Sequence, residues 1–271
     1  MKKLNFIIKY GLALLLLSFY SCESWLNVTP SDRLSEEMLF NDREGFVKAL
    51  NGVYIELNTN ELYGRNLTAG ALDVMGQYYS VASSSHAFYN YGGLVYTGND
   101  EKALFDNMWQ KCYAVIACCN TIIEKCDENK AGLSPVWRGS IKGEALALRA
   151  MLHFDMLRLF GPLTSELDKE SIPYQTNSDQ TVTPLLSGSA VVGLILDDLK
   201  NAVGLLKDTD PYFVEEEFSD TDLNYRRFRM NYFAAKGLMA RVQLWGGDKE
   251  KAAATAKEVI AEGQAEGAEF F

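Results

Sequence analysis

The chain has 271 residues, a formal net charge of −10 and 12% aromatic residues, and it contains only two histidines. This length is sufficient for one large domain or two small ones with a substantial buried core. The acidic balance and the lack of a basic patch exclude nucleic acid as an expected partner and favour neutral or cationic ones.

Residues 1–21 have the order of a secretory signal. A basic start with three lysines precedes the apolar run Tyr10–Leu17, and Cys22 stands at the junction with a more polar sequence. The apolar run is too short to cross a bilayer as a helix. A cysteine at this point is typical of bacterial lipoprotein signals, so we expect Cys22 to be acylated, and an ordinary signal with a chance cysteine is the alternative. Removal of residues 1–21 with their three lysines would lower the formal charge to −13. Acyl chains alone would then anchor the protein to a membrane.

Most of the remaining chain shows the apolar spacing of amphipathic helices. We expect one or two helices within Ser31–Leu57. We expect one helix in each of five further segments: Glu101–Cys126, Val136–Phe160, Val192–Leu206, Asn231–Trp245 and Asp248–Glu262. The last two have the length and small residues of a tetratricopeptide-type hairpin. The sequence therefore predicts a mostly α fold of stacked tetratricopeptide-like helical hairpins with a long aromatic-rich irregular loop.

Three segments lack the helical pattern. Residues 161–188 contain three prolines, which predicts a loop, and the acidic stretch Lys207–Arg226 is interpreted as a solvated connection. The third, Glu61–Asn99, combines six glycines with seven tyrosine and phenylalanine residues and is too long for a simple connection. Since so many aromatic residues argue against disorder, we expect this tyrosine loop (residues 61–99) to be ordered and to carry the binding site.

The polar and thiol residues of the helices are interpreted as structural. Cys112, Cys118, Cys119 and Cys126 share one helix, where a separation of seven residues is about 10 Å, too far for a disulfide. We expect all four to be small buried residues. We also expect His153 to be packed within its helix, and Arg149 to tie helices together through carboxylates or carbonyls.

No grouping of side chains selects a catalytic reaction. The sequence contains no recognisable metal motif, phosphate-binding loop or nucleophile with its base, and no carboxylate pair stands out among 36 acidic residues. We therefore expect no catalytic residue, no metal, no cofactor and no enzymatic activity.

Several short motifs resemble the SusD/RagB-like outer-membrane lipoproteins of polysaccharide-utilisation systems, in the order found in that family. They are Trp25–Asp32 after Cys22, Ala49–Tyr54, Trp109–Tyr113 with Asn120, Gly143–Ala150 followed by Phe154-Asp155 and Arg158–Pro162, Asp197–Leu199, and Ala240–Trp245. The resemblance implies a helical fold at the cell surface and capture of glycans for a SusC-like TonB-dependent transporter. Family members are usually much longer, so residues 22–271 would form the helical N-terminal domain, with the C-terminal half missing.

The tyrosine loop is the expected glycan platform. A tyrosine ring can cover the apolar C–H face of a pyranose, while neighbouring polar side chains bind its hydroxyls. The candidate ligand-binding residues are Asp73, Tyr78, Tyr79, His86, Tyr89, Asn90 and Tyr91. These rings could instead pack the loop onto the helices or contact the transporter.

Two other functions remain open at this point. A peptide could replace the glycan as cargo, and its binding to an acidic surface would then depend on salt. Alternatively, the protein could be a periplasm-facing lipoprotein scaffold whose tetratricopeptide-like groove holds partner proteins.

Overall fold

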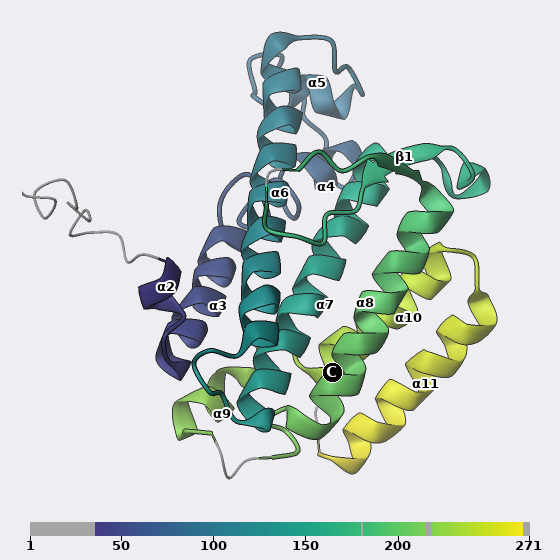
Figure 1. Ribbon diagram of the computed structural model, residues 1–271. Helices are drawn as coiled ribbons and strands as arrows, with labels where there is room; N and C mark the ends of the chain where they lie inside the picture. The colour runs from purple at the N-terminus through teal and green to yellow at the C-terminus, as the bar shows by residue number, and fades with distance from the viewer. Residues whose placement is uncertain (1–35, 180, 215–217, 268–271) are drawn as a thin grey trace, which may run out of the picture. The chain divides into compact units, whose positions relative to one another are not determined.

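The computed structural model describes residues 36–179, 181–214 and 218–267 (Figure 1). The expected signal, Cys22 and the start of the Ser31–Leu57 region lie outside the described residues. The chain divides into two units, Met1–Leu39 and Phe40–Phe271. In the first unit, α2 (Glu36–Leu39) is a single helical turn.

The second unit is built from long helices, which confirms the mostly α prediction. Within it, α6 packs on α7, α7 on α8, α8 on α10, and α10 on α11, so that successive helices form stacked hairpins (Figure 1). The long helices are α3 (Arg43–Leu57), α6 (Asn99–Glu128), α7 (Pro135–Phe160), α8 (Gly188–Thr209), α10 (Tyr232–Trp245) and α11 (Lys249–Ala265). The short ones are α4 (Ala71–Met75), α5 (Tyr89–Gly92), α9 (Asp220–Arg226) and the 3₁₀ turn Thr164–Glu166.

Side-chain caps fix where these helices begin. The Asp42 carboxylate accepts a hydrogen bond from Gly45 N (2.8 Å), and Ser134 Oγ accepts one from Trp137 N (3.3 Å), directly before Pro135. Asn231 and Asp248 cap α10 and α11 in the same way. Each cap satisfies a backbone N–H that has no partner within the helix.

Glycines on α7 allow α8 to approach closely. A Cβ atom at Gly139 would lie 2.5 Å from Thr209 Cγ2, and one at Gly143 would lie 2.8 Å from Leu206 Cγ. Both distances are below van der Waals contact, so a side chain at either position would force Thr209 or Leu206 to shift. Helix α7 is thereby buried along most of its length.

The prediction of a loop over residues 161–188 is wrong in part, because this segment is not wholly irregular. It includes an antiparallel pair of short strands, β1 (Glu170–Pro173) and β2 (Leu185–Ser187), with Glu170 opposite Ser187. The pair is followed directly by α8, whose first turn is capped by Ser187.

Two other expectations are wrong in part. The Lys207–Arg226 stretch is not simply solvated, because α8 continues into it to Thr209 and both Asp210 and Arg226 are buried. Cys118 is exposed, because it lies on a different side of α6 from Cys112, Cys119 and Cys126, which are buried as expected.

Arg149 ties three elements together, as expected. Its guanidinium donates a two-pronged pair of hydrogen bonds to the Asp198 carboxylate on α8, each 2.7 Å long. A third bond reaches Asn120 Oδ1 on α6 (2.8 Å), and a fourth reaches the Thr176 carbonyl (3.3 Å). Tyr174 also donates to Asp198 (2.6 Å), so the buried carboxylate accepts three hydrogen bonds.

His153 is packed in the core, which confirms its structural interpretation. Its Nδ1 lies 3.0 Å from the Arg149 carbonyl, and its Nε2 accepts a hydrogen bond from Gln175 N (3.0 Å). The ring stacks on Tyr174 at 3.9 Å between centroids. This arrangement needs a neutral ring with the proton on Nδ1, and burial lowers the pKa of His153 to about 3.

We therefore expect a loss of stability on mild acidification that depends on His153. An unfolded histidine has a pKa of about 6.5, so between that value and about 3 only the unfolded chain takes up the proton. Stability is then lost as pH falls, at about 1.4 kcal/mol per pH unit below the unfolded pKa. Urea unfolding of wild type and His153→Gln between pH 7.5 and 5.0 measures this slope.

The chain supplies its own control for this experiment. His86 is exposed, so His86→Gln should keep the wild-type pH dependence. Buried carboxylates such as Glu144 titrate at lower pH, because their unfolded pKa is about 4.3. An unchanged slope above pH 5 in His153→Gln would show that His153 is not the titrating group.

Candidate functional site

An aromatic cluster holds the tyrosine loop on α6. Tyr91 contacts Phe88, Tyr96 and Phe105 with ring centroids 5.7, 6.4 and 6.0 Å apart, and Phe105 belongs to α6. Tyr91 is only 2% exposed. The expectation that Tyr91 presents its ring to a ligand is therefore wrong, because that ring is used to pack the loop.

A hollow lies beside α5. Its volume is about 430 Å³, and it is lined by Gln77, Tyr79, Ser80, Val81, Tyr89, Asn90, Gly92, Gly93 and Val95. We call it the tyrosine-loop hollow. Tyr79 is 55% exposed and Tyr89 42% exposed, so both rings keep surface that a ligand could cover.

Two side-chain amides in this lining are held by their nitrogens. Asn90 Nδ2 donates to the Glu101 carboxylate (2.7 Å), and Gln77 Nε2 donates to the Gly92 carbonyl (3.0 Å) and the Val74 carbonyl (3.3 Å). Each amide retains a carbonyl oxygen, which can accept a hydrogen bond from a hydroxyl. The lining thus combines aromatic rings with hydrogen-bond acceptors.

The other predicted residues lie outside the hollow. Tyr78 is 80% exposed, and its ring lies so close to Gly76 that a Cβ there would be 3.1 Å from it. The exposed ring of His86 accepts a hydrogen bond from Phe88 N through Nδ1 (3.0 Å), and Asp73 is half-buried in α4.

The structure therefore brings together Tyr79, Tyr89 and Asn90 of the predicted set. It adds Gln77 and Ser80, which sequence analysis missed. Their position beside the Tyr78-Tyr79 pair was the only available signal.

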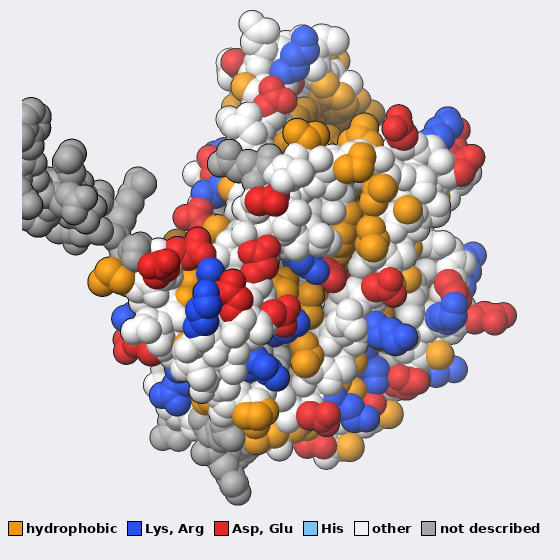
Figure 2. Space-filling model, viewed as in Figure 1, with side chains coloured by type: hydrophobic (Ala, Val, Ile, Leu, Met, Phe, Trp, Pro, Cys, Tyr) orange, Lys and Arg blue, Asp and Glu red, His pale blue; other side chains and the backbone are white. Residues whose placement is uncertain are grey.

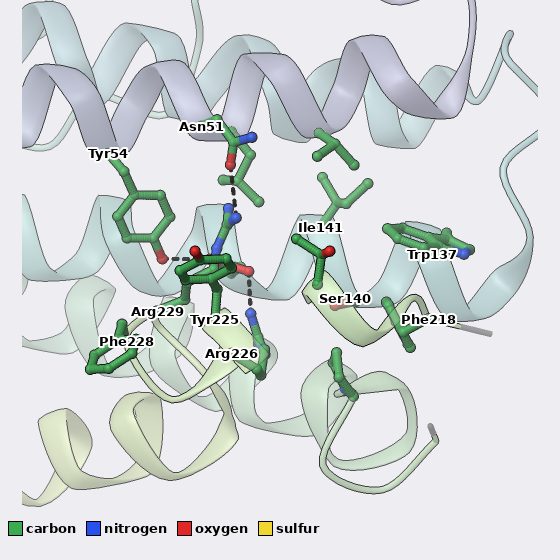
Figure 3. Close-up of a pocket in the computed structure, with 15 residues that line it drawn as sticks. Asn51, Tyr54, Trp137, Ser140, Ile141, Phe218, Tyr225, Arg226, Phe228 and Arg229 are labelled. Atoms are coloured by element: carbon green, nitrogen blue, oxygen red, sulfur yellow. Dashed lines mark hydrogen bonds and ion pairs between the residues drawn. The ribbon is translucent and has the colours of Figure 1, made fainter. Parts of the chain in front are cut away.

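A second pocket lies between α3, α7 and the segment around α9 (Figure 3). Its volume is about 490 Å³. Figure 3 shows the side chains that surround it, and the aromatic ones are Tyr54, Trp137, Phe218, Tyr225 and Phe228. Tyr225 is 62% exposed and Phe228 69% exposed.

A buried ionic network forms one side of this second pocket. The Glu144 carboxylate accepts hydrogen bonds from Tyr54 Oη, Arg226 and Arg229, and Arg226 is also paired with Asp210. Although burial acts to raise it, the charges of Arg226 and Arg229 hold the pKa of Glu144 below its usual value. Since these groups satisfy one another, we interpret the network as structural.

Charged groups of both signs cover much of the face shown in Figure 2, while apolar side chains gather below the end that carries α5. Within the described part of the chain, no helix is both long and apolar enough to cross a membrane.

Comparison with known proteins assigns the fold to a class and the chain to a family. A family model described as "Starch-binding associating with outer membrane" (SusD-like) matches residues 24–244. A SusD-like protein of Formosa agariphila is 25% identical over 95% of this chain and 46% of its own length. A SusD-like protein of Bacteroides ovatus is 30% identical over 52% of this chain and 23% of its own.

Solved structures show the same fold. A SusD superfamily protein from Bacteroides vulgatus superposes with a TM-score of 0.65 at 21% identity, over 84% of this chain and 48% of that structure. A laminarin-binding SusD-like protein superposes with a TM-score of 0.59 at 17% identity, over 81% of this chain and 43% of that structure. These likenesses define a helical protein of the tetratricopeptide-like class.

The chain belongs to the SusD-like family, as its sequence motifs indicated. It spans less than half the length of the relatives described above.

Proposed function

We propose that this chain is the helical N-terminal part of a surface lipoprotein that captures glycan and delivers it to a SusC-like TonB-dependent transporter. The observation that carries the proposal is the tyrosine-loop hollow, where exposed Tyr79 and Tyr89 lie beside the amides of Gln77 and Asn90. Aromatic rings and amide oxygens suit the two surfaces of a sugar, its C–H face and its hydroxyls.

Family membership supports the same function. The family model is described as starch-binding and outer-membrane associating, and one structural neighbour is named as laminarin-binding. In this proposal Cys22 is the acylated residue, residues 1–21 are the signal, and the protein is held on the outer membrane with its glycan site facing outward. Asp73, Tyr78 and His86 would then contact longer glycans outside the hollow.

Removing both rings from the hollow should weaken glycan binding. For Tyr79→Ala/Tyr89→Ala we expect a dissociation constant raised at least about tenfold, because each ring contributes stacking in addition to the area it covers. Affinity electrophoresis against a panel of polysaccharides identifies a ligand, and calorimetry then gives the dissociation constants.

Tyr225→Ala is the matched control. Tyr225 is an exposed tyrosine of the second pocket, so its loss should leave glycan affinity unchanged. If Tyr225→Ala weakens binding and the double variant does not, the site lies in the second pocket and the assignment to the tyrosine loop is wrong.

Delivery is tested separately in native outer membrane. Gentle detergent extraction and affinity capture of the protein, followed by mass spectrometry, should recover a TonB-dependent barrel. Capture without such a barrel, from membranes in which the barrel is detected, would contradict the delivery step while leaving glycan binding intact.

A further inference from the structure

The tyrosine-loop hollow has no positively charged side chain. Its nine lining residues are aromatic, apolar, hydroxyl, amide or glycine residues. The sequence from residue 66 to residue 99 contains neither lysine nor arginine. The cations that flank this stretch are Arg65, whose guanidinium lies over the Phe88 ring at 5.9 Å, and Lys102 on α6, and neither lines the hollow.

Negative charge lies directly behind the lining. Glu101 is 5% exposed, and its carboxylate accepts the hydrogen bond from Asn90 Nδ2 (2.7 Å). Asp100 precedes it on the same turn of α6. Burial, and then the charges of Glu101 and Asp100, raise the pKa of nearby Tyr91.

The hydrogen bonds made by the side-chain amides of Asn90 and Gln77 determine which amide atoms face a ligand in the hollow. The amide nitrogens of Asn90 and Gln77 are bonded within the protein, so each of these two amides presents its acceptor oxygen to a ligand. A carboxylate or sulfate group carries only acceptors and would meet oxygen atoms there, whereas a hydroxyl can donate. A desolvated anion is strongly disfavoured where no cation pairs with it, even where neutral hydroxyls such as that of Ser80 can donate to it.

We infer that the hollow selects uncharged glycans and rejects those that carry uronate or sulfate groups. This inference rests on the proposed function and narrows its ligand class. The selection comes from two features together, acceptor oxygens on the inside and the Glu101 carboxylate behind them, while the tyrosine rings bind the apolar sugar face that both glycan classes share.

The test compares derivatives of one polysaccharide. The full chain is titrated with a neutral polysaccharide that retards it in affinity gels, and with carboxymethyl and hydroxyethyl derivatives of the same polymer at equal substitution. We expect the carboxymethyl form to bind on the order of tenfold more weakly than the hydroxyethyl form at low salt. This difference in affinity should become smaller as the salt concentration rises from about 20 mM to about 0.5 M, since screening weakens the repulsion between the carboxymethyl groups and the protein's negative charges.

A charge added to the hollow should change this preference. Ser80 lines the hollow, so Ser80→Lys should reduce the ratio of the dissociation constants of the carboxymethyl and hydroxyethyl forms by roughly threefold. Ser84 is exposed in the same loop but does not line the hollow, and Ser84→Lys should leave the difference as it is.

The outcomes separate this inference from the function on which it rests. Equal or tighter binding of the carboxymethyl form, or of native alginate or polygalacturonate, overturns the inference while the glycan-binding function stands. If no polysaccharide of either kind binds, the proposed function is wrong and the inference falls with it.

Discussion

Replacing Arg226 by methionine is expected to lower the free energy of unfolding by about 3–5 kcal/mol, because it leaves buried charge without its partner. Arg226 bonds both oxygens of Asp210 and also pairs with Glu144, and all three side chains are buried. Among the residues that the structure describes, the donors left to Asp210 would be the backbone N–H groups of Tyr212 and Tyr232. Two such donors do not replace a bidentate guanidinium.

Arg227→Met is the control for this prediction. Arg227 follows in sequence and is exposed, and it contacts only the exposed ring of Phe228 among the interactions described for it. Its replacement should change stability by no more than about 0.5 kcal/mol. Urea unfolding followed by circular dichroism compares the two variants, and equal midpoints would mean that the Arg226 network contributes nothing to stability.

The second large effect is expected at Arg149. Arg149→Met removes four hydrogen bonds to α6, α8 and the segment after β1, and it leaves Asp198 buried with Tyr174 as its remaining side-chain donor. We expect a loss of about 3–5 kcal/mol. Arg149→Lys keeps the charge but cannot reproduce the fork, so it should recover only part of that loss.

The same unfolding experiment tests this graded order. Arg138→Met, at an exposed position on the same helix, provides the baseline for loss of an arginine from α7. If Arg149→Lys were as stable as wild type, charge alone would account for the role of Arg149, and the bidentate geometry would be unimportant.

The long helices could be predicted because local signals agreed with one another. Apolar spacing predicted α6 and α7, and in the structure Ser134, directly before Pro135, caps the start of α7. Length and small residues predicted α10 and α11, and Asn231 and Asp248, where the predicted ranges begin, are their capping residues in the structure.

The site could be predicted only to the level of a loop. Tyr89 and Tyr91 are two residues apart in α5, yet one is 42% exposed and the other 2%. A helix of four residues has no measurable period, so nothing local distinguishes the ring that faces solvent from the ring that packs on Phe105. Gln77 was missed for a related reason, since its place in the hollow depends on bonds to Gly92, fifteen residues later.

The ionic network escaped prediction because its partners are far apart in sequence. Arg226 and Asp210 fall in an acidic stretch that is typical of a solvated connection, and only the packing of this stretch near α7 gives Arg226 its second partner, Glu144. Arg149 was easier, since an arginine within the otherwise apolar run Ala145–Leu152 must find acceptors nearby.

The polar partners of α3 lie far away in the sequence, and this separation affects when their contacts can form during synthesis of the chain. Tyr54 Oη accepts a hydrogen bond from Met230 N, and Asn51 accepts one from Arg229, across 176 and 178 residues. A growing chain that has not yet reached Arg226 already contains Glu144 but neither of its arginines. Loop closure of this length is slow relative to formation of local helices. Glu144 on α7 therefore has neither arginine partner until the segment before α10 has been made.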